Sequence, residues 1–223
     1  GVATLKVGQY ESYFKTAAGN NQDIFNDHNE LDMTAVLAGE DRLKNVIGFE
    51  TDKKLLGGLA FNIMFQQGEE SEAADSTAKG KEGSRDGFGD GVSTSLTYEN
   101  KDFGLAAAVA GNFGVASKYN AYSLSGIYTD AVRVTGSLDL TPAGVDGLVF
   151  GALWQTAQPT DDTVSTKSGT PAIVTSYKGL QEDAFGVTAA YKIGATPLKL
   201  KAQYISAKSE TDAAIIAGKK ELK

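Results

Sequence analysis

A chain of 223 residues with 41% hydrophobic side chains and 26 glycines has neither the composition of a disordered protein nor that of a helical membrane protein. Its formal net charge of -7 argues against a nucleic-acid partner, because proteins that bind nucleic acids normally carry a basic stripe. The absence of cysteine excludes disulfide bonds, thiolate zinc sites and thiol nucleophiles.

Segments in which apolar and polar residues alternate recur along the whole chain and predict β-strands. Most are about ten residues long, whereas globular strands are most often about 5–6 residues and tilted membrane-spanning strands about 9–11. In chain order, the expected strands cover residues 3–10, 42–51, 58–67, 90–100, 103–112, 131–141, 147–157, 184–194 and 196–207.

Short and long connections alternate between these strands. The short ones are rich in turn formers and begin near Asp52, Lys101, Pro142 and Ala195. The long ones cover residues 11–41, 68–89, 113–130, 158–183 and the chain from 208 onward. This alternation is typical of an up-and-down barrel of the outer-membrane kind, with tight turns on one side and loops on the other.

The segment Tyr122–Tyr128 also alternates, but a further crossing there would put the long connections on opposite sides. We therefore expect it in a structured external loop or as an extension of a neighbouring strand beyond the bilayer. Both ends of the chain resemble cuts: no signal peptide precedes the first strand, and another strand could begin near Lys219.

Each expected strand divides its side chains between an apolar and a polar face. In 196–207, Leu198, Leu200, Ala202 and Tyr204 share one face, and Lys199, Lys201 and Gln203 share the other. In 131–141, Val132, Val134, Leu138 and Leu140 oppose Arg133, Thr135, Ser137 and Asp139. Aromatic residues gather near strand ends, as in the aromatic girdles of membrane barrels. Alternation alone is equally compatible with a soluble sandwich.

Several segments resemble the general porins, the trimeric, 16-stranded outer-membrane diffusion channels of Gram-negative bacteria. They are "TLKVGQYESYF" (4–14), "QDIFND" (22–27), "RLKNVIGFETDKKLLGGLAFNIMFQQGE" (42–69), "VRVTGSLDL" (132–140) and "GLVFGALWQ" (147–155). The resemblance implies an all-β, transmembrane, antiparallel up-and-down β-barrel with short periplasmic turns and long external loops. Residues 1–223 would form a single barrel domain that lacks N-terminal and C-terminal strands.

The resemblance further implies a water-filled channel for passive diffusion of small hydrophilic solutes and ions, without a cofactor. It implies a homotrimer in contact with outer-membrane lipid and lipopolysaccharide.

The loop 11–41 would fold inward and narrow the lumen, with an acidic side formed by Asp23, Asp27, Glu30 and Asp32. Alternation from Leu5 and Val7 turns Lys6 inward, and alternation from Leu43 does the same for Arg42 and Lys44. The same criterion adds Arg133, Lys199 and Lys201 to a basic wall. Opposed charged walls would orient dipolar solutes and disfavour apolar ones.

Two other functions fit parts of the sequence. His28 is the single histidine and lies in a polar loop, so a membrane esterase or phospholipase would have to use it. Metal-binding pairs of His or Cys are absent, and Asp161 with Asp162 could at best bind Ca²⁺ weakly. The non-enzymatic alternative is a soluble or surface β-sandwich that binds carbohydrate or protein, with its apolar faces packed against each other.

Overall fold

The computed structural model describes residues 2–19, 23–25, 31–68, 87–161, 163–166, 173–212 and 218–222. Its main element is a ten-stranded antiparallel sheet, in which each strand pairs with its sequence neighbours except where a small hairpin intervenes. The strands are β1 (Ala3–Glu11), β2 (Arg42–Thr51), β3 (Leu59–Gln67), β4 (Phe88–Asn100), β5 (Leu105–Tyr119), β6 (Leu124–Asp139), β7 (Leu148–Pro159), β10 (Gln181–Lys192), β11 (Lys199–Thr211) and β12 (Gly218–Leu222). β8 (Thr163–Thr166) and β9 (Ile173–Ser176) form the separate hairpin.

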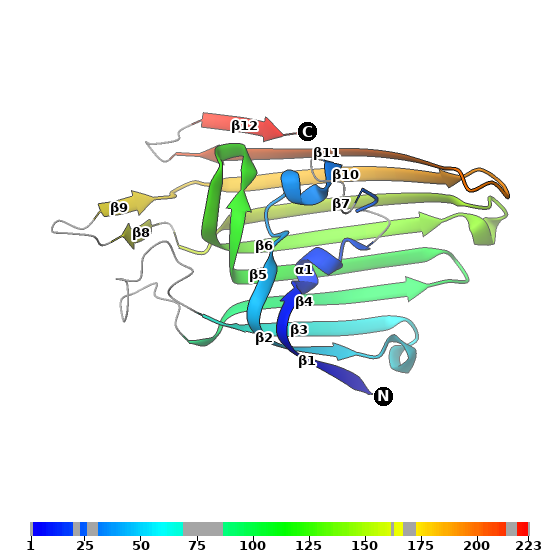
Figure 1. Ribbon diagram of the computed structural model, residues 1–223, viewed down its shortest axis with the longest axis horizontal. Helices are drawn as coiled ribbons and strands as arrows, with labels where there is room; N and C mark the ends of the chain where they lie inside the picture. The colour runs from blue at the N-terminus through cyan, green and yellow to red at the C-terminus, as the bar shows by residue number, and fades with distance from the viewer. Residues whose placement is uncertain are drawn as a thin grey trace.

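The predicted all-β, up-and-down antiparallel organisation is confirmed. Each predicted strand is present, with ends shifted by a few residues in most cases. The sheet is curved and remains open: its order runs from β1 to β12, and these two strands do not pair with each other in the described chain (Figure 1).

The short turns lie together at one end of the sheet (Figure 1). In three of them a carboxylate or amide side chain accepts a backbone N–H at the start of the turn. Asp52 Oδ1 accepts from Lys54 N at 2.9 Å, Asn100 Oδ1 from Asp102 N at 3.0 Å, and Asp139 Oδ1 from Thr141 N at 2.9 Å. Such Asx interactions replace the ladder hydrogen bonds that end with the strand. We call this end the turn end and the opposite one the loop end.

The connection predicted over 113–130 is not a long loop. β5 and β6 continue well past the predicted limits and meet in a tight turn at the short 3₁₀ helix η5 (Asn120–Tyr122). Irregular register between Asn112 and Val115 bends this hairpin away from the main sheet. Of the two alternatives for Tyr122–Tyr128, extension of a neighbouring strand is therefore the one adopted.

The two faces of the main sheet differ in the polarity and in the exposure of their side chains. One face carries exposed apolar side chains, and we call it the apolar face. It includes Leu5, Val7, Phe49, Phe61, Leu96, Val109, Val132, Val134, Leu138, Phe150, Trp154, Phe185, Val187, Leu200 and Tyr204. The other, covered face buries many polar side chains, among them Ser93, Ser95, Asn112, Arg133, Thr135, Ser137, Gln155, Glu182, Thr188 and Ser209. The covered face buries apolar side chains as well, but the many large apolar side chains exposed on the other face are unusual for a monomeric soluble protein.

The covered face is buried because the connection between β1 and β2 lies across it (Figure 1). We call residues 12–41 the crossing loop; it contains the helical turn α1 (Tyr13–Thr16) and the 3₁₀ turn η2 (Met33–Ala35). Its apolar residues pack against inward residues of the strands. Met33 and Leu37, for example, join Leu153 and Ile205 in one cluster. The other 3₁₀ turns, η3 (Lys53–Leu56) and η6 (Thr141–Ala143), belong to the turn end.

Candidate functional site

The crossing loop enters the covered face through α1. Ser12 caps this turn, because its backbone is extended and its Oγ accepts a hydrogen bond from Lys15 N at 3.0 Å. Phe14 N donates to Ser93 Oγ on β4 at 3.2 Å, and Thr135 Oγ1 on β6 donates to Ala17 O at 2.9 Å. Hydroxyl groups of the wall thus satisfy backbone groups of the loop that would otherwise be buried without partners.

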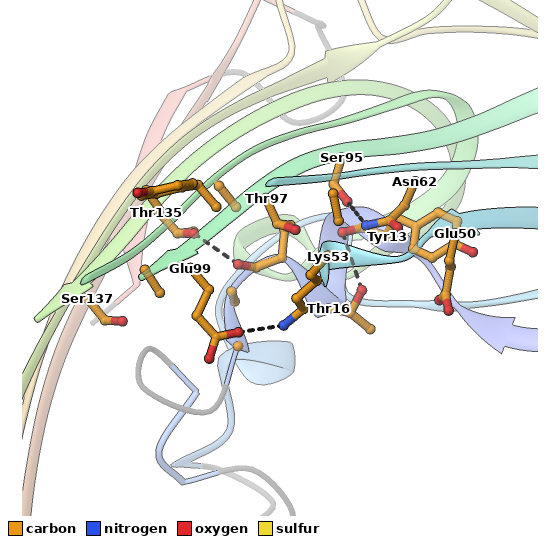
Figure 2. A pocket seen from close by; sticks show the side chains of 18 of the residues that line it. Tyr13, Thr16, Glu50, Lys53, Asn62, Ser95, Thr97, Glu99, Thr135 and Ser137 are labelled. Atoms are coloured by element: carbon orange, nitrogen blue, oxygen red, sulfur yellow. Dashed lines mark hydrogen bonds and ion pairs between the residues drawn. The ribbon is translucent and has the colours of Figure 1, made fainter. Parts of the chain in front are cut away.

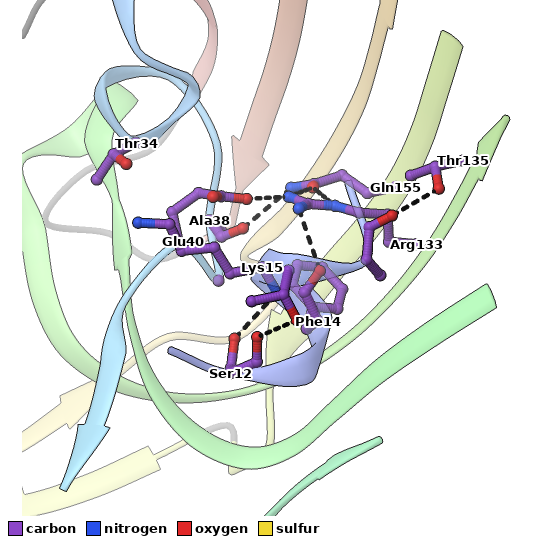
Figure 3. A network of polar contacts seen from close by, with 12 residues as sticks. Ser12, Phe14, Lys15, Thr34, Ala38, Glu40, Arg133, Thr135 and Gln155 are labelled. Carbon is purple, nitrogen blue, oxygen red and sulfur yellow. Dashed lines mark hydrogen bonds and ion pairs between the residues drawn. The ribbon is translucent and has the colours of Figure 1, made fainter. Parts of the chain in front are cut away.

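Arg133 is completely buried where the loop crosses β6 and β7 (Figure 3). Its guanidinium forms an ion pair with Glu40 and donates from Nε to Gln155 Oε1 at 3.0 Å. It also donates to Phe14 O at 3.4 Å, and its central carbon lies 4.2 Å from the centre of the Phe14 ring. One side chain therefore contacts both limbs of the crossing loop. A charge removed from water in this way requires a full set of partners.

The returning limb of the loop, residues 38–40, is bound by side chains from three more strands. Glu182 on β10 accepts from Ala38 N at 2.8 Å and from Ser209 Oγ on β11 at 3.3 Å. Gln155 Nε2 donates to Ala38 O at 3.2 Å, and Gly39 N donates to Ser117 Oγ on β5 at 2.6 Å. The position of this limb is consequently set by directional polar contacts as well as by packing.

The loop also reaches β11, far from its origin at β1. Lys201 Nζ donates to Ile24 O at 2.7 Å, and Gln203 Nε2 donates to Leu31 O at 3.0 Å. Lys201 Nζ additionally lies 5.7 Å from the centre of the Phe25 ring. Both wall residues belong to the polar face predicted for 196–207, so that face is the covered one.

The bent hairpin of β5 and β6 closes over the loop end of the same region. Tyr122 Oη donates to Ser209 O at 3.0 Å, and Asn120 Nδ2 donates to Thr34 O at 3.0 Å. Lys118 forms an ion pair with Asp41 at 2.9 Å. Tyr119 and Tyr122 pack with Ile127 and Leu180 in one cluster. The covered face is thus filled near β6 to β11.

Open space remains nearer β1 to β6, on either side of α1. A cavity of about 550 Å³ lies toward the turn end (Figure 2), and we call it the turn-side chamber. A second cavity of about 510 Å³ is lined by Lys6, Tyr10, Glu11 and Arg42, and we call it the loop-side chamber. Tyr13, Thr16 and Glu50 line both chambers. The chambers are therefore neighbours beside α1, and we call the position of these three residues, between them, the junction.

The junction and the turn-side chamber carry paired charges. Lys6 forms an ion pair with Glu50 and lies 5.4 Å from the centre of the Tyr10 ring. Lys53 Nζ lies 2.6 Å from Glu99 Oε2 at the far wall of the turn-side chamber. These contacts cancel much of the charge that the lining would otherwise present to a solute.

Among the acidic groups that the structure describes in the crossing loop, Glu40 is buried, and Asp23 and Asp32 are half-buried. The pKa of Asp23 is raised to about 6: burial is the largest cause, the carboxylates of Asp32 and Glu40 add to it, and Lys15 and Arg133 oppose it. Burial also raises the pKa of Glu40, although Arg133 opposes this effect. Asp32 caps η2 by accepting from Thr34 N at 2.8 Å.

The predicted basic residues do not form one continuous open wall. Lys6 lies at the junction and Arg42 lines the loop-side chamber, whereas Arg133 is enclosed beneath the loop. Lys201 binds a loop carbonyl, and Lys199 is exposed near the turn end, opposite Lys192 in the register.

The prediction that Lys44 points inward assumes that Leu43 points outward, and it is wrong. Leu43 is buried on the covered face with Tyr13 and Val46, so the exposed Lys44 extends from the opposite side of β2. The reason is Asn45, whose φ of 53° breaks the regular alternation before Val46. Arg42 precedes the inward Leu43, so it does not point inward either. It borders the loop-side chamber because it lies at the start of β2.

Among the acidic residues, Asp23 and Asp32 lie in the crossing loop as described above. Asp27 and Glu30, and likewise His28, lie outside the described residues. Sequence reasoning missed Glu40, Gln155 and Glu182, which bind the loop, and Glu50, which pairs with Lys6. Gln155 and Glu50 occupy inward positions of predicted strands, so the two-residue period contained the signal for them.

No protein-family model matches the chain, and no curated protein matches it. Within the described ranges, no helix is long and apolar enough to cross a membrane. The same residues contain no cluster of His, Cys, Asp and Glu that could hold a metal ion.

Proposed function

We propose that this chain forms part of the wall, and the narrowing loop, of a porin-type channel through which small hydrophilic solutes and ions diffuse passively. The observation that carries the proposal is the distribution of polarity over the sheet: large apolar side chains are exposed on one face, and charged and polar side chains are buried together with apolar ones on the other. A strand wall with lipid outside and water inside requires this arrangement.

The strands support this proposal by their length and register. β4, β7, β10 and β11 have 12 or 13 residues each, enough to cross a bilayer when tilted. On the apolar face, Trp154 pairs in register with Val134 on one side and Phe185 on the other. The rings of Phe185 and Tyr204 then lie 5.8 Å apart on the next pair of strands. The result is an apolar band that runs across neighbouring strands.

The crossing loop supports the channel proposal from the other face. It fills the region near β6 to β11 and leaves the two chambers near β1 to β6, which lie next to each other beside α1. In the proposed channel the solute passes from the loop-side chamber to the turn-side chamber past Tyr13, Thr16 and Glu50. Transport of this kind needs no bond-making chemistry and no cofactor.

The location and assembly belong to the same proposal. We place the protein in the outer membrane of a Gram-negative bacterium, in contact with lipid and lipopolysaccharide, as a homotrimer. The exposed apolar face and the resemblance of the strand segments to general porins support this assignment. The β-sandwich alternative would need a second layer over the apolar face. The described chain has only the ten-stranded sheet and the separate two-stranded hairpin.

The direct test is a planar-bilayer recording on the protein that contains this chain. We expect stepwise, ohmic conductance. Lys6→Glu replaces the ion pair at the junction by two carboxylates and should increase the preference for cations, measured as a shift in reversal potential across a salt gradient. Lys54→Glu, an equal charge change at an exposed turn residue, should leave the reversal potential nearly unchanged.

Absence of channels in repeated reconstitutions would contradict the proposal. Purification as a monodisperse protein without detergent would contradict it as well, because the apolar face could not then be the lipid-facing surface.

A further inference from the structure

We propose that the turn-side chamber is a binding site for uncharged, polyhydroxylated solutes the size of a simple sugar. The inference rests on the proposed function in one respect, namely that the solute reaches the chamber through the channel. The volume of about 550 Å³ lies within the range of about 300–1,000 Å³ typical of small-molecule sites.

The register of β4, β5 and β6 gives the chamber a grooved floor. Thr97 on β4 pairs with Ala108 on β5, which pairs with Thr135 on β6. The next row is Glu99, Ala106 and Ser137. The inward positions of the middle strand are thus alanines, and polar side chains stand on both sides of them. Since neighbouring strands are about 4.8 Å apart, the two polar rows are roughly 10 Å apart. This spacing is of the order of the width of a sugar ring with its hydroxyl groups.

The other walls are small or polar. Asn62 on β3 donates from Nδ2 to Ser95 Oγ at 3.1 Å, which extends the polar row toward the junction (Figure 2). Tyr98 and Ala60 of the strands also line the chamber, as do Ala17, Ala18 and Gly19 of the crossing loop. The short residues of the loop leave the space above the floor open.

The charges of the chamber favour a neutral occupant. Lys53 is paired with Glu99, and Glu50 is paired with Lys6, so an ion entering the chamber would have to compete with a partner already in place. Hydroxyl groups, in contrast, both donate and accept hydrogen bonds, as the hydroxyls of a sugar do. The Thr97 hydroxyl bonds to no residue that the structure describes, and it points into the chamber (Figure 2).

The test compares two isosteric substitutions on the detergent-solubilised protein. Thr97→Val removes a chamber hydroxyl, and Thr156→Val makes the same change on the other side of the wall, next to Trp154. Binding of glucose is measured by saturation-transfer NMR over a concentration series. We expect saturable binding that Thr97→Val weakens about fivefold, the effect of one lost neutral hydrogen bond, and that Thr156→Val leaves within about twofold. Asn62→Ala should act in the same direction as Thr97→Val.

Glycine is the zwitterionic comparison, and we expect it to bind more weakly than glucose. Non-saturable glucose signals, equal effects of the two valine substitutions, or tighter binding of glycine would each overturn the inference. Conductance without glucose binding would leave the channel standing and remove the site. Glucose binding without conductance would keep the site and remove the channel.

Discussion

Arg133 on β6 and Glu40 at the end of the crossing loop form an ion pair that is fully enclosed between the loop and the wall. Phe14 lies against the same guanidinium, so the pair joins the two limbs of the loop to one point of the sheet. The energetic consequence depends on which partner is removed, because an isolated buried charge is far more costly than an absent pair.

Arg133→Met should therefore lower the free energy of unfolding by about 3–5 kcal/mol, since Glu40 loses its counter-charge in a buried site. The double variant Arg133→Met with Glu40→Gln should cost less than the sum of the single changes. Denaturant titrations in detergent measure both. Lys118→Met breaks the partly exposed pair with Asp41 and should cost at most about 1 kcal/mol. Additive costs for Arg133 and Glu40 would contradict the coupling.

Asp23 should make stability depend on pH in a defined window. Its pKa is about 6 in the folded protein against an ordinary value of 3.8, so the folded state binds this proton more tightly than the unfolded chain does. The free energy of unfolding should therefore fall as the pH rises from about 4 to about 6, and this contribution should be constant above that range.

The measurement is the unfolding midpoint as a function of pH. Asp23→Asn should remove this part of the fall, whereas Asp146→Asn, at an exposed turn residue, should retain it. Identical pH profiles for the native protein and Asp23→Asn would show that the carboxyl group is not desolvated.

Trp154 provides a direct probe of the apolar face, because it is the single tryptophan of the chain and about half of its surface is exposed. In vesicles whose lipids carry bromine on the acyl chains, its fluorescence should be strongly quenched. Iodide in the aqueous phase should have little effect. The opposite pattern, with quenching by iodide alone, would place this face in water.

Gly104 should be much less tolerant of substitution than Gly144, although both have positive φ in turns at the same end of the sheet. A Cβ at Gly104 would overlap the carbonyl oxygen of Asp139, whereas nothing lies within 4 Å of the corresponding position at Gly144. Gly144→Ala should cost about 1 kcal/mol from the backbone conformation alone. Gly104→Ala should cost clearly more, because relieving the overlap would also disturb the hydrogen bond from Asp139 N to Gly104 O, which is 2.8 Å long in the native protein. Equal losses in a denaturant titration would contradict this ranking.

The two-residue period of the sequence predicted the strands and the sharing of their faces, because it follows directly from the pleat of a β-strand. It placed Val132 and Val134 opposite Arg133, and Leu200 opposite Lys201, as the structure has them. The period failed at Asn45, where a single residue of positive φ inverts the faces before and after it. The local sequence does not predict this conformation, because most asparagine residues in strands have negative φ.

The candidate site was less accessible to sequence reasoning. That Arg133 is enclosed rather than open to water depends on Glu40 and Gln155, which approach it only after the loop has crossed the sheet. The course of the β5–β6 hairpin likewise depends on a register change near Gly114, whose N–H is bound by Asp130 Oδ1 at 2.8 Å. These contacts join residues that are distant in the sequence, so they cannot be predicted from periodicity or from turn residues.

The crossing loop has a mechanical consequence for the curved sheet. The loop leaves the sheet at Glu11 on β1, and Lys201 and Gln203 bind it to β11 by hydrogen bonds. It therefore connects two distant strands across the concave side of the curved sheet. Because the number of residues in the loop is fixed, the loop limits how far the sheet can flatten. The diameter of the proposed channel is therefore governed by the number of residues in this loop as well as by the hydrogen-bond register of the strands. Shortening the loop would draw β1 and β11 together.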